Sequence, residues 1–201
     1  MMVRALAGTG KTTTIQAATA LIPDQILYLA YNKHIADDYI PRKLSNTEVR
    51  TTHAHGYKAI LSAIKYGQGK EVTMDQYKVH NLVKLLLATQ YLEIGEENTK
   101  LLQTSIPKFV SHLKSTLLPY STESIEYLAD KYNIENYYIL IENNVGIKYT
   151  KADGSIYEIN VDLITDISKK IMQICFRAFL PNESCSIDFD DQFWLPIVRP
   201  D

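Results

Sequence analysis

The stretch Ala5-Leu6-Ala7-Gly8-Thr9-Gly10-Lys11-Thr12 decides the fold of this chain. It fits a pattern in which four residues separate a small residue from Gly-Lys-Ser/Thr, with Ala5 where the strictest form has glycine. Gly8 and Gly10 permit left-handed backbone torsions, which turn successive N–H groups toward one anion. Residues 2–5 have the composition of a strand end and residues 12–21 that of a helix, so the loop is expected to lead from a strand into a helix N-terminus.

The residues around the second glycine complete a predicted site for a nucleoside triphosphate. Lys11 would reach the β- and γ-phosphates, and the Thr12 hydroxyl would complete the coordination shell of Mg²⁺. ATP and Mg²⁺ are therefore the expected cofactors, with Lys11 and Thr12 as candidate catalytic residues and Thr12 as the metal ligand. The expected cofactor-binding residues are Ala5, Ala7, Gly8, Thr9, Gly10, Lys11, Thr12 and Thr13.

Strand-length and helix-length segments alternate after this loop. Residues 25–31 and 49–52 are apolar, aromatic or β-branched, as in strands, whereas residues 33–39 and 54–66 have helical spacing. Short connections between such segments predict a parallel sheet with helices on its faces. The expected fold class is α/β, with a P-loop core.

The pattern becomes mainly helical from Gly67 onward. Helices are expected at residues 74–89, after a cap at Ser121 or Thr122, and at residues 161–176, with a hairpin around residues 152–154. We interpret residues 67–184 as a helical insertion into the α/β core. The core itself would then comprise residues 1–66 and 185–201.

Composition limits the classes of partner and compartment. The 201 residues are 46% hydrophobic and 22% charged, and the net charge of −2 indicates that any contact with nucleic acid is local. Cys175 and Cys185 lack the spacing of metal ligands, which favours reduced thiols. No apolar run reaches the length that spans a membrane, so we expect a soluble cytoplasmic protein, or a nuclear one in a eukaryote, without a membrane partner.

Two polar segments follow the predicted strands. Tyr31, Asn32 and Lys33 offer an aromatic ring, an amide and a cation, the groups needed to stack a base and hold a phosphate. Thr52 and His53 stand in the same relation to the next strand. Open α/β sheets bind ligands at these carboxyl ends. His53 and His55 lack accompanying carboxylates or cysteines, so we do not expect a metal site there.

In their order along the chain, the phosphate loop and these two segments resemble motifs I, Ia and Ib of superfamily 1 DNA helicases of the UvrD/Rep type. The chain looks most like the F-box DNA helicase branch and its phage relatives. The stretch from Ile187 to Pro196 is similar to an acidic and aromatic segment that precedes motif II in those helicases.

The resemblance implies a partial RecA-like ATP-binding domain 1A, formed by residues 1–66 and 185–201, and an inserted subdomain 1B, formed by residues 67–184. It also implies that a single-stranded DNA track is lined by Tyr31, Asn32, Lys33, Thr52 and His53. The complete protein would couple ATP hydrolysis to 3′-to-5′ translocation and unwinding of DNA in repair or replication.

Three carboxylates lie within four residues, at Asp188, Asp190 and Asp191. Such a cluster raises the hypothesis of catalysis. We instead expect Asp188 to cap the N-terminus of a helix and Trp194 to lie in the core.

The helicase pattern also contains parts that this sequence does not. These are the acidic Walker B strand of motif II, motifs III to VI and the second RecA-like domain. We therefore expect a helicase fragment that binds triphosphate weakly, depends on the remainder of the helicase as a partner and does not hydrolyse ATP by itself.

Two alternatives remain open at this point. A small P-loop kinase would need arginines clustered in a lid, whereas the five arginines of this chain are scattered along it. The chain could also be a non-catalytic truncated product whose helical part binds DNA or a partner protein.

Overall fold

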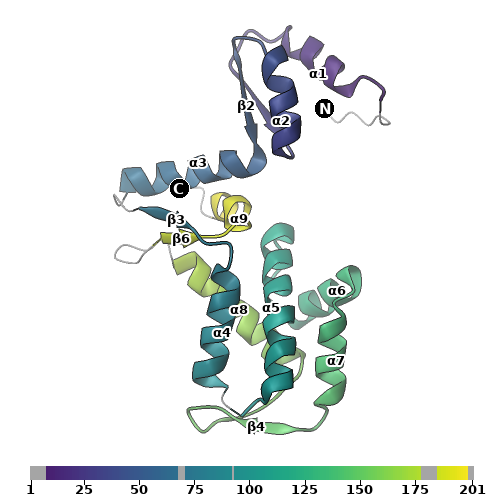
Figure 1. Cartoon of the computed structure of the whole chain (residues 1–201), viewed down its shortest axis with the longest axis vertical. Coiled ribbons are helices and arrows are strands. Elements are labelled where there is room, and N and C mark those ends of the chain that lie inside the picture. The colour runs from purple at the N-terminus through teal and green to yellow at the C-terminus, as the bar shows by residue number, and fades with distance from the viewer. Residues whose placement is uncertain (1–7, 68–70, 92, 178–184, 199–201) are drawn as a thin grey trace. The chain divides into compact units, whose positions relative to one another are not determined.

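The computed structural model describes residues 8–67, 71–91, 93–177 and 185–198 (Figure 1). The chain divides into two compact units, which we call unit 1 (Met1–Ala59) and unit 2 (Ile60–Asp201). The described residues combine many helices with small parallel sheets, which confirms the mixed α/β class. Each unit is described by itself below.

Unit 1 alternates helices with two parallel strands. Its elements are α1 (Lys11–Thr19), β1 (Ile26–Ala30), α2 (Lys33–Tyr39), the 3₁₀ turn η1 (Ile40–Arg42), β2 (Thr47–Thr51) and the start of α3 (Thr52–Gly67). β1 and β2 pair from Ile26 opposite Thr47 to Ala30 opposite Thr51. The predicted strands and helices of this region are therefore confirmed with small shifts of their ends, while the strand predicted at residues 2–5 lies outside the described residues.

One face of β1 packs against helix α2, whereas the other carries exposed apolar side chains. Tyr28 stacks on Tyr39 of α2 with ring centroids 3.9 Å apart. Leu27 and Leu29 point to the opposite face and remain 40% and 45% exposed among the described residues. A parallel sheet ordinarily buries both faces, so this face of β1 is uncovered apolar surface.

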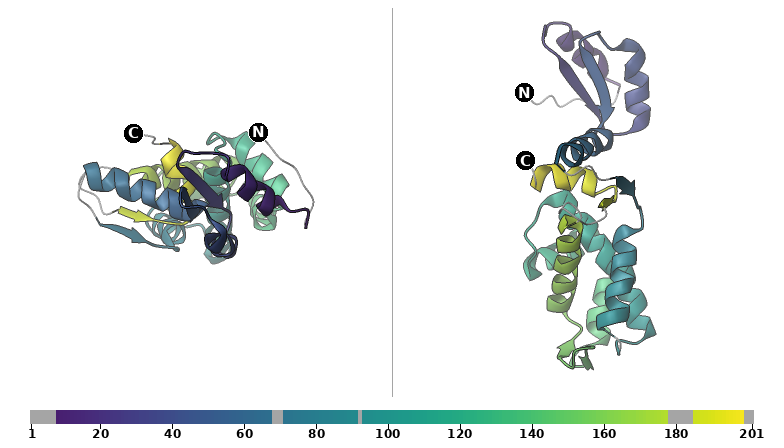
Figure 2. Two further views of the ribbon diagram at one scale, coloured as in Figure 1. Left: turned by 90° about the horizontal axis from the view of Figure 1, so that it is seen from above. Right: turned by 90° about the vertical axis from the view of Figure 1, so that its left-hand side faces the viewer.

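Unit 2 is a helical body with two small pairs of strands. Its helices after α3 are α4 (Lys78–Gln90), α5 (Glu96–Thr116), α6 (Thr122–Tyr132), α7 (Glu135–Asn143), α8 (Val161–Arg177) and α9 (Asp191–Val198). Figures 1 and 2 show α4, α5 and α8 running alongside one another, and these three helices contact each other in pairs. The core is centred on α5, which buries Leu102, Ile106, Phe109, Val110 and Leu113. Helical spacing of these apolar residues produces the buried stripe.

The strands of unit 2 are short. β4 (Lys148–Thr150) and β5 (Ile156–Glu158) form the antiparallel hairpin that the sequence predicted. β3 (Val72–Met74) pairs in parallel with β6 (Cys185–Ile187). The assignment of residues 185–201 to the same domain as residues 1–66 stays a prediction.

The helix predicted from Met74 begins four residues later, at Lys78, so the predicted start is wrong. Met74 belongs to β3, and the N–H of Asp75 donates to the carbonyl of Ile187 at 2.9 Å. Pairing with a strand more than a hundred residues away in sequence therefore overrides the local helical spacing at this point.

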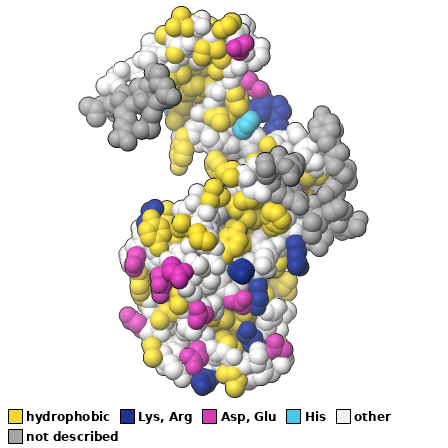
Figure 3. Space-filling model, turned by 180° about the vertical axis from the view of Figure 1, so that it is seen from behind, with side chains coloured by type: hydrophobic (Ala, Val, Ile, Leu, Met, Phe, Trp, Pro, Cys, Tyr) yellow, Lys and Arg dark blue, Asp and Glu magenta, His cyan; other side chains and the backbone are white. Residues whose placement is uncertain are grey.

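The surface of unit 2 carries charges of both signs. Figure 3 shows acidic and basic side chains interspersed on the face of this unit that it presents, together with scattered hydrophobic side chains. On this face no broad patch of one sign is visible among the described residues. The view agrees with the inference from net charge that any nucleic-acid contact is local.

Helix α6 begins at a side-chain cap. The Ser121 hydroxyl accepts a hydrogen bond from the N–H of Ser124 at 3.3 Å, Glu123 lies in the first turn and Lys131 in the last. Both charges are favourably placed relative to the helix dipole. Of the two predicted caps, Ser121 is the one observed.

We predict that Ser121→Ala lowers the free energy of unfolding by about 1 kcal/mol, because the first turn of α6 loses its acceptor. Trp194, the only tryptophan of the chain, is buried in unit 2, so its fluorescence during urea unfolding reports this change. Ser121→Asp restores an acceptor and should unfold like the parent chain. Equal stability of the alanine variant would show that the cap contributes nothing.

Candidate functional site

The predicted phosphate loop enters α1 through two glycines in the left-handed region. Gly8 and Gly10 both have φ of +77°, a torsion that other residues adopt only with strain. Gly10 is the N-cap of α1, and as a glycine it has no side chain that could cap this end of the helix. The predicted contacts Ala5 and Ala7 lie outside the described residues.

The first turn of α1 presents cationic and hydroxyl side chains to solvent. Lys11, Thr12 and Thr13 are exposed and follow Gly10 directly. The turn contains no acidic residue that would neutralise the positive end of the helix dipole. An N-terminus of this kind attracts an oxyanion, since its backbone N–H groups have no acceptor within the helix.

The β1–β2 register brings the other predicted site residues to one end of the small sheet. Ala30 pairs with Thr51, so Tyr31 and Thr52 follow paired residues at the carboxyl ends of the two strands. Their assignment to a DNA-binding site stays a prediction.

Tyr31 is strongly exposed, with 82% of its surface accessible. Asn32 caps α2 by accepting a hydrogen bond from the N–H of Ile35 at 3.0 Å. Lys33 is the first residue of α2 and is also exposed. Asn32 therefore has a structural role through its oxygen, while its amide N–H₂ group remains a possible donor to a ligand.

Thr52 and His53 begin α3 at the end of β2. The Thr52 hydroxyl is buried and has no hydrogen-bond partner among the described residues. The neighbouring Thr51 hydroxyl accepts from the N–H of Ala54 at 3.1 Å and so holds the first turn of α3. A buried hydroxyl without a partner is costly, and a ligand or a water molecule at this strand end would satisfy it.

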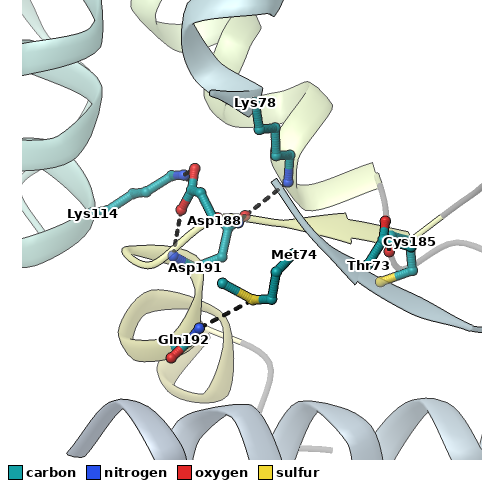
Figure 4. A network of polar contacts seen from close by, with 8 residues as sticks. All are labelled: Thr73, Met74, Lys78, Lys114, Cys185, Asp188, Asp191 and Gln192. Carbon is teal, nitrogen blue, oxygen red and sulfur yellow. Dashed lines mark hydrogen bonds and ion pairs between the residues drawn. The ribbon is translucent and has the colours of Figure 1, made fainter. Parts of the chain in front are cut away.

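Asp188 and Asp191 form a reciprocal cap at the start of α9 (Figure 4). The N–H of Asp191 donates to Asp188 Oδ1 at 2.8 Å, and the N–H of Asp188 donates to Asp191 Oδ2 at 3.1 Å. This arrangement is that of a capping box. The predicted capping role of Asp188 and the buried position of Trp194 are both confirmed.

Two buried lysines neutralise these carboxylates. Lys114 Nζ lies 2.6 Å from Asp188 Oδ2 and 2.8 Å from Asp191 Oδ1, and Lys78 Nζ lies 2.8 Å from Asp191 Oδ2. Burial alone would lower the pKa of Lys114, but the adjacent carboxylates raise it above its ordinary value. Lys114 is therefore held in its charged form. We call these four side chains the ion-pair network.

Asp188 and Asp191 of the ion-pair network also belong to a group of potential metal ligands, but their ion pairs argue against a metal site there. Cys175, Asp188 and Asp191 place one ligand atom each within 4.8 Å of one another. Lysine ammonium groups already pair with both carboxylates, and burial raises the pKa of the Cys175 thiol, which favours its neutral form. The donor set fits ion pairing rather than cation binding.

Sequence reasoning did not single out Lys78 or Lys114. Lys114 follows Leu113 and lies four residues after Val110, so it continues the apolar stripe of α5. Lys78 is the first residue of α4 and is buried, as are Val83 and Leu86 of the same helix. A lone cation on an apolar helix face was the available signal that a buried acidic partner exists.

No protein-family model, curated protein or solved structure matches this chain. None of the helices in the described ranges is both long and apolar enough to cross a bilayer. The functional argument therefore depends on the geometry of the residues themselves.

We predict that Lys114→Met destabilises unit 2 by about 3–5 kcal/mol, because it leaves two buried carboxylates without their shared partner. The readout is urea unfolding followed by Trp194 fluorescence. Lys108→Met removes an exposed lysine from the same helix and should change stability by less than about 0.5 kcal/mol. A loss in Lys114→Met no larger than in this control would contradict the assigned role of the network.

The same variant should show a pH dependence of defined sign. Without Lys114, the buried negative charge of Asp188 and Asp191 would keep only one of its two countercharges, Lys78. Protonation would then favour the folded state. The difference in free energy of unfolding between Lys114→Met and the parent should therefore shrink as the pH is lowered from neutral toward the range where carboxylates titrate. A deficit that stays constant or grows on acidification would show that unpaired charge is not its cause.

Proposed function

We propose that residues 8–13 bind the phosphates of a magnesium–nucleoside triphosphate, and that the chain is the N-terminal ATP-binding part of a UvrD-like DNA helicase. The observation that carries this proposal is a pair of glycines in the left-handed region, the second of which is the N-cap of a helix that begins with Lys11 and Thr12. Each feature favours bound anion, and together they match the P-loop pattern of the sequence.

The exposed side chains of Lys11 and Thr12 would bind different parts of the ligand. The Lys11 ammonium would pair with the β- and γ-phosphate oxygens as a point charge. The Thr12 hydroxyl is an oxygen donor of the kind that Mg²⁺ accepts, and the bound ion would offset phosphate charge. The backbone at Gly8 and Gly10 would approach the phosphates closely, since neither residue carries a Cβ.

Single-stranded DNA is the proposed second ligand of unit 1. Tyr31 lies exposed at the end of β1, where its ring is available to stack on a base. Lys33 would contact a backbone phosphate, and Thr52 and His53 begin the helix that follows the neighbouring strand.

The remainder of the helicase is the proposed protein partner. Among the described residues the parallel sheet of unit 1 consists of β1 and β2 and exposes Leu27 and Leu29 on one face, whereas both faces of a parallel sheet are ordinarily covered. Motif II carboxylates and transition-state arginines would come from that remainder, because catalysis of phosphoryl transfer needs both. The RecA-like architecture of residues 1–66 with 185–201 belongs to this proposal.

We predict that Lys11→Ala weakens binding of magnesium–ATP by about 10- to 100-fold, the loss expected for one hydrogen bond to a charged group. Equilibrium titration with a fluorescent ATP analogue measures the effect. Lys84→Ala removes an exposed lysine from unit 2 and serves as the charge-matched control. Equal affinities of the Lys11→Ala and Lys84→Ala variants for magnesium–ATP would refute phosphate binding by this loop. Phosphorylation of a small acceptor by the chain would favour the kinase alternative.

We predict that Tyr31→Ala weakens binding of an oligo(dT) strand by about 5- to 100-fold, because base stacking on an aromatic ring is lost, whereas Tyr31→Trp retains it. Fluorescence anisotropy of labelled DNA measures this change. Tyr77→Ala removes an exposed tyrosine from unit 2 as the control. Lys33→Ala should reduce the slope of log K against log salt by about 0.7. Binding that is unchanged by all of these substitutions would place the DNA site elsewhere.

A further inference from the structure

Unit 2 contains a pocket of its own, with a volume of about 410 Å³. We call it the aromatic pocket. Its lining includes Tyr120, Met172, Gln173, Phe176, Arg177 and Trp194. It is separate in sequence from the phosphate loop and from every residue assigned to the DNA track. The proposed function therefore leaves it unexplained.

Three aromatic rings form the apolar walls. The rings of Phe176 and Trp194 lie 6.2 Å apart at an angle of 63°. Tyr120 lines the same pocket, and Trp194 is buried, with 3% of its surface exposed. Met172 also lines the pocket, and its side chain is buried.

The ion-pair network holds this arrangement in place. Trp194 lies in the first turns of α9, directly after the reciprocal cap of Asp188 and Asp191. Lys114 Nζ lies 6.0 Å from the centroid of the Trp194 ring. The walls are therefore preorganised by buried contacts, so that little side-chain entropy would be lost when a ligand binds.

The polar part of the lining comes from the last turns of α8. Gln173 and Arg177 are four residues apart, so they project from the same side of the helix, and both are exposed. A glutamine amide both donates and accepts, which matches the edge of a nucleobase. A guanidinium offers a planar fork of donors, which matches phosphate.

These features together define one class of ligand. Rings favour a flat aromatic group, the amide favours a hydrogen-bonding edge, and the guanidinium favours an anion attached nearby. The volume lies at the small end of the range of ligand pockets, which suits a single nucleotide better than a peptide segment. We propose that the aromatic pocket binds one nucleotide, with its base among the rings, its edge at Gln173 and its phosphate at Arg177.

Arg177 also ends α8, where a cation interacts favourably with the helix dipole. The two roles differ in a measurable way. Lysine preserves the charge at the helix end but lacks the planar fork, so Arg177→Lys separates phosphate recognition from helix stabilisation. The nucleotide could be free or could be an unpaired residue of a DNA strand, and the probes below distinguish these sources.

The test uses quenching of Trp194 fluorescence in the full chain carrying Lys11→Ala, so that the phosphate loop does not contribute. The probes are dTMP, oligo(dT) of five nucleotides, the corresponding abasic oligonucleotide and inorganic phosphate. We expect saturable quenching by dTMP or by oligo(dT), and none by the abasic strand or by phosphate. Quenching by dTMP identifies a free nucleotide as sufficient, whereas quenching by oligo(dT) alone identifies a strand.

Variants then assign the binding to the pocket. Arg177→Ala should weaken binding at least about tenfold, Arg177→Lys should recover only part of that loss, and Gln173→Ala should weaken binding several-fold. Lys169→Ala removes an exposed charge from the same helix and should bind like the parent. Circular dichroism checks that each variant is folded.

Three results would overturn the proposal. The first is an absence of quenching by both nucleotide probes. The second is equal binding by the Arg177→Ala and Lys169→Ala variants. The third is equal quenching by the abasic strand, which would show that the base is not recognised. Because the phosphate loop is disabled throughout, failure here is independent of triphosphate binding by unit 1.

Discussion

The folded form of unit 2 depends on the burial of four charges in one place. Asp188 and Asp191 cap each other's backbone, and Lys78 and Lys114 neutralise their carboxylates from α4 and α5. An isolated buried charge would cost several kcal/mol, so each helix keeps its position only while its partner is present. Segments far apart in the sequence are thereby fixed to one another, and the walls of the aromatic pocket with them.

The groups proposed to bind phosphate in unit 1 are exposed, in contrast to the buried charges of unit 2. Two glycines hold torsions that other residues avoid, and the helix that follows begins without a side-chain cap. The β1–β2 register adds Tyr31 and Thr52 at the ends of neighbouring strands.

Local signals in the sequence predicted many of the elements and part of the site. The alternation of strand-length and helix-length segments after Lys11 predicted α2, α3 and the two strands of unit 1. Ser121, a hydroxyl residue two positions before Glu123, was one of the two predicted caps of α6. The prediction was wrong at Met74, because β3 forms through pairing with a distant strand that no local pattern contains. The ion-pair network was missed for the same reason, since a lysine in a helix shows nothing of a carboxylate 74 residues later.

By itself, the sequence determined the glycine torsions at the loop, the helix caps and the order of strands and helices, because these follow from backbone sterics and neighbouring side chains. Only the tertiary structure decided that Asp188 and Asp191 are neutralised by ion pairing, and that Trp194, Phe176 and Tyr120 enclose a pocket. Burial and pairing depend on contacts between distant segments. Those contacts exist only once the chain has folded.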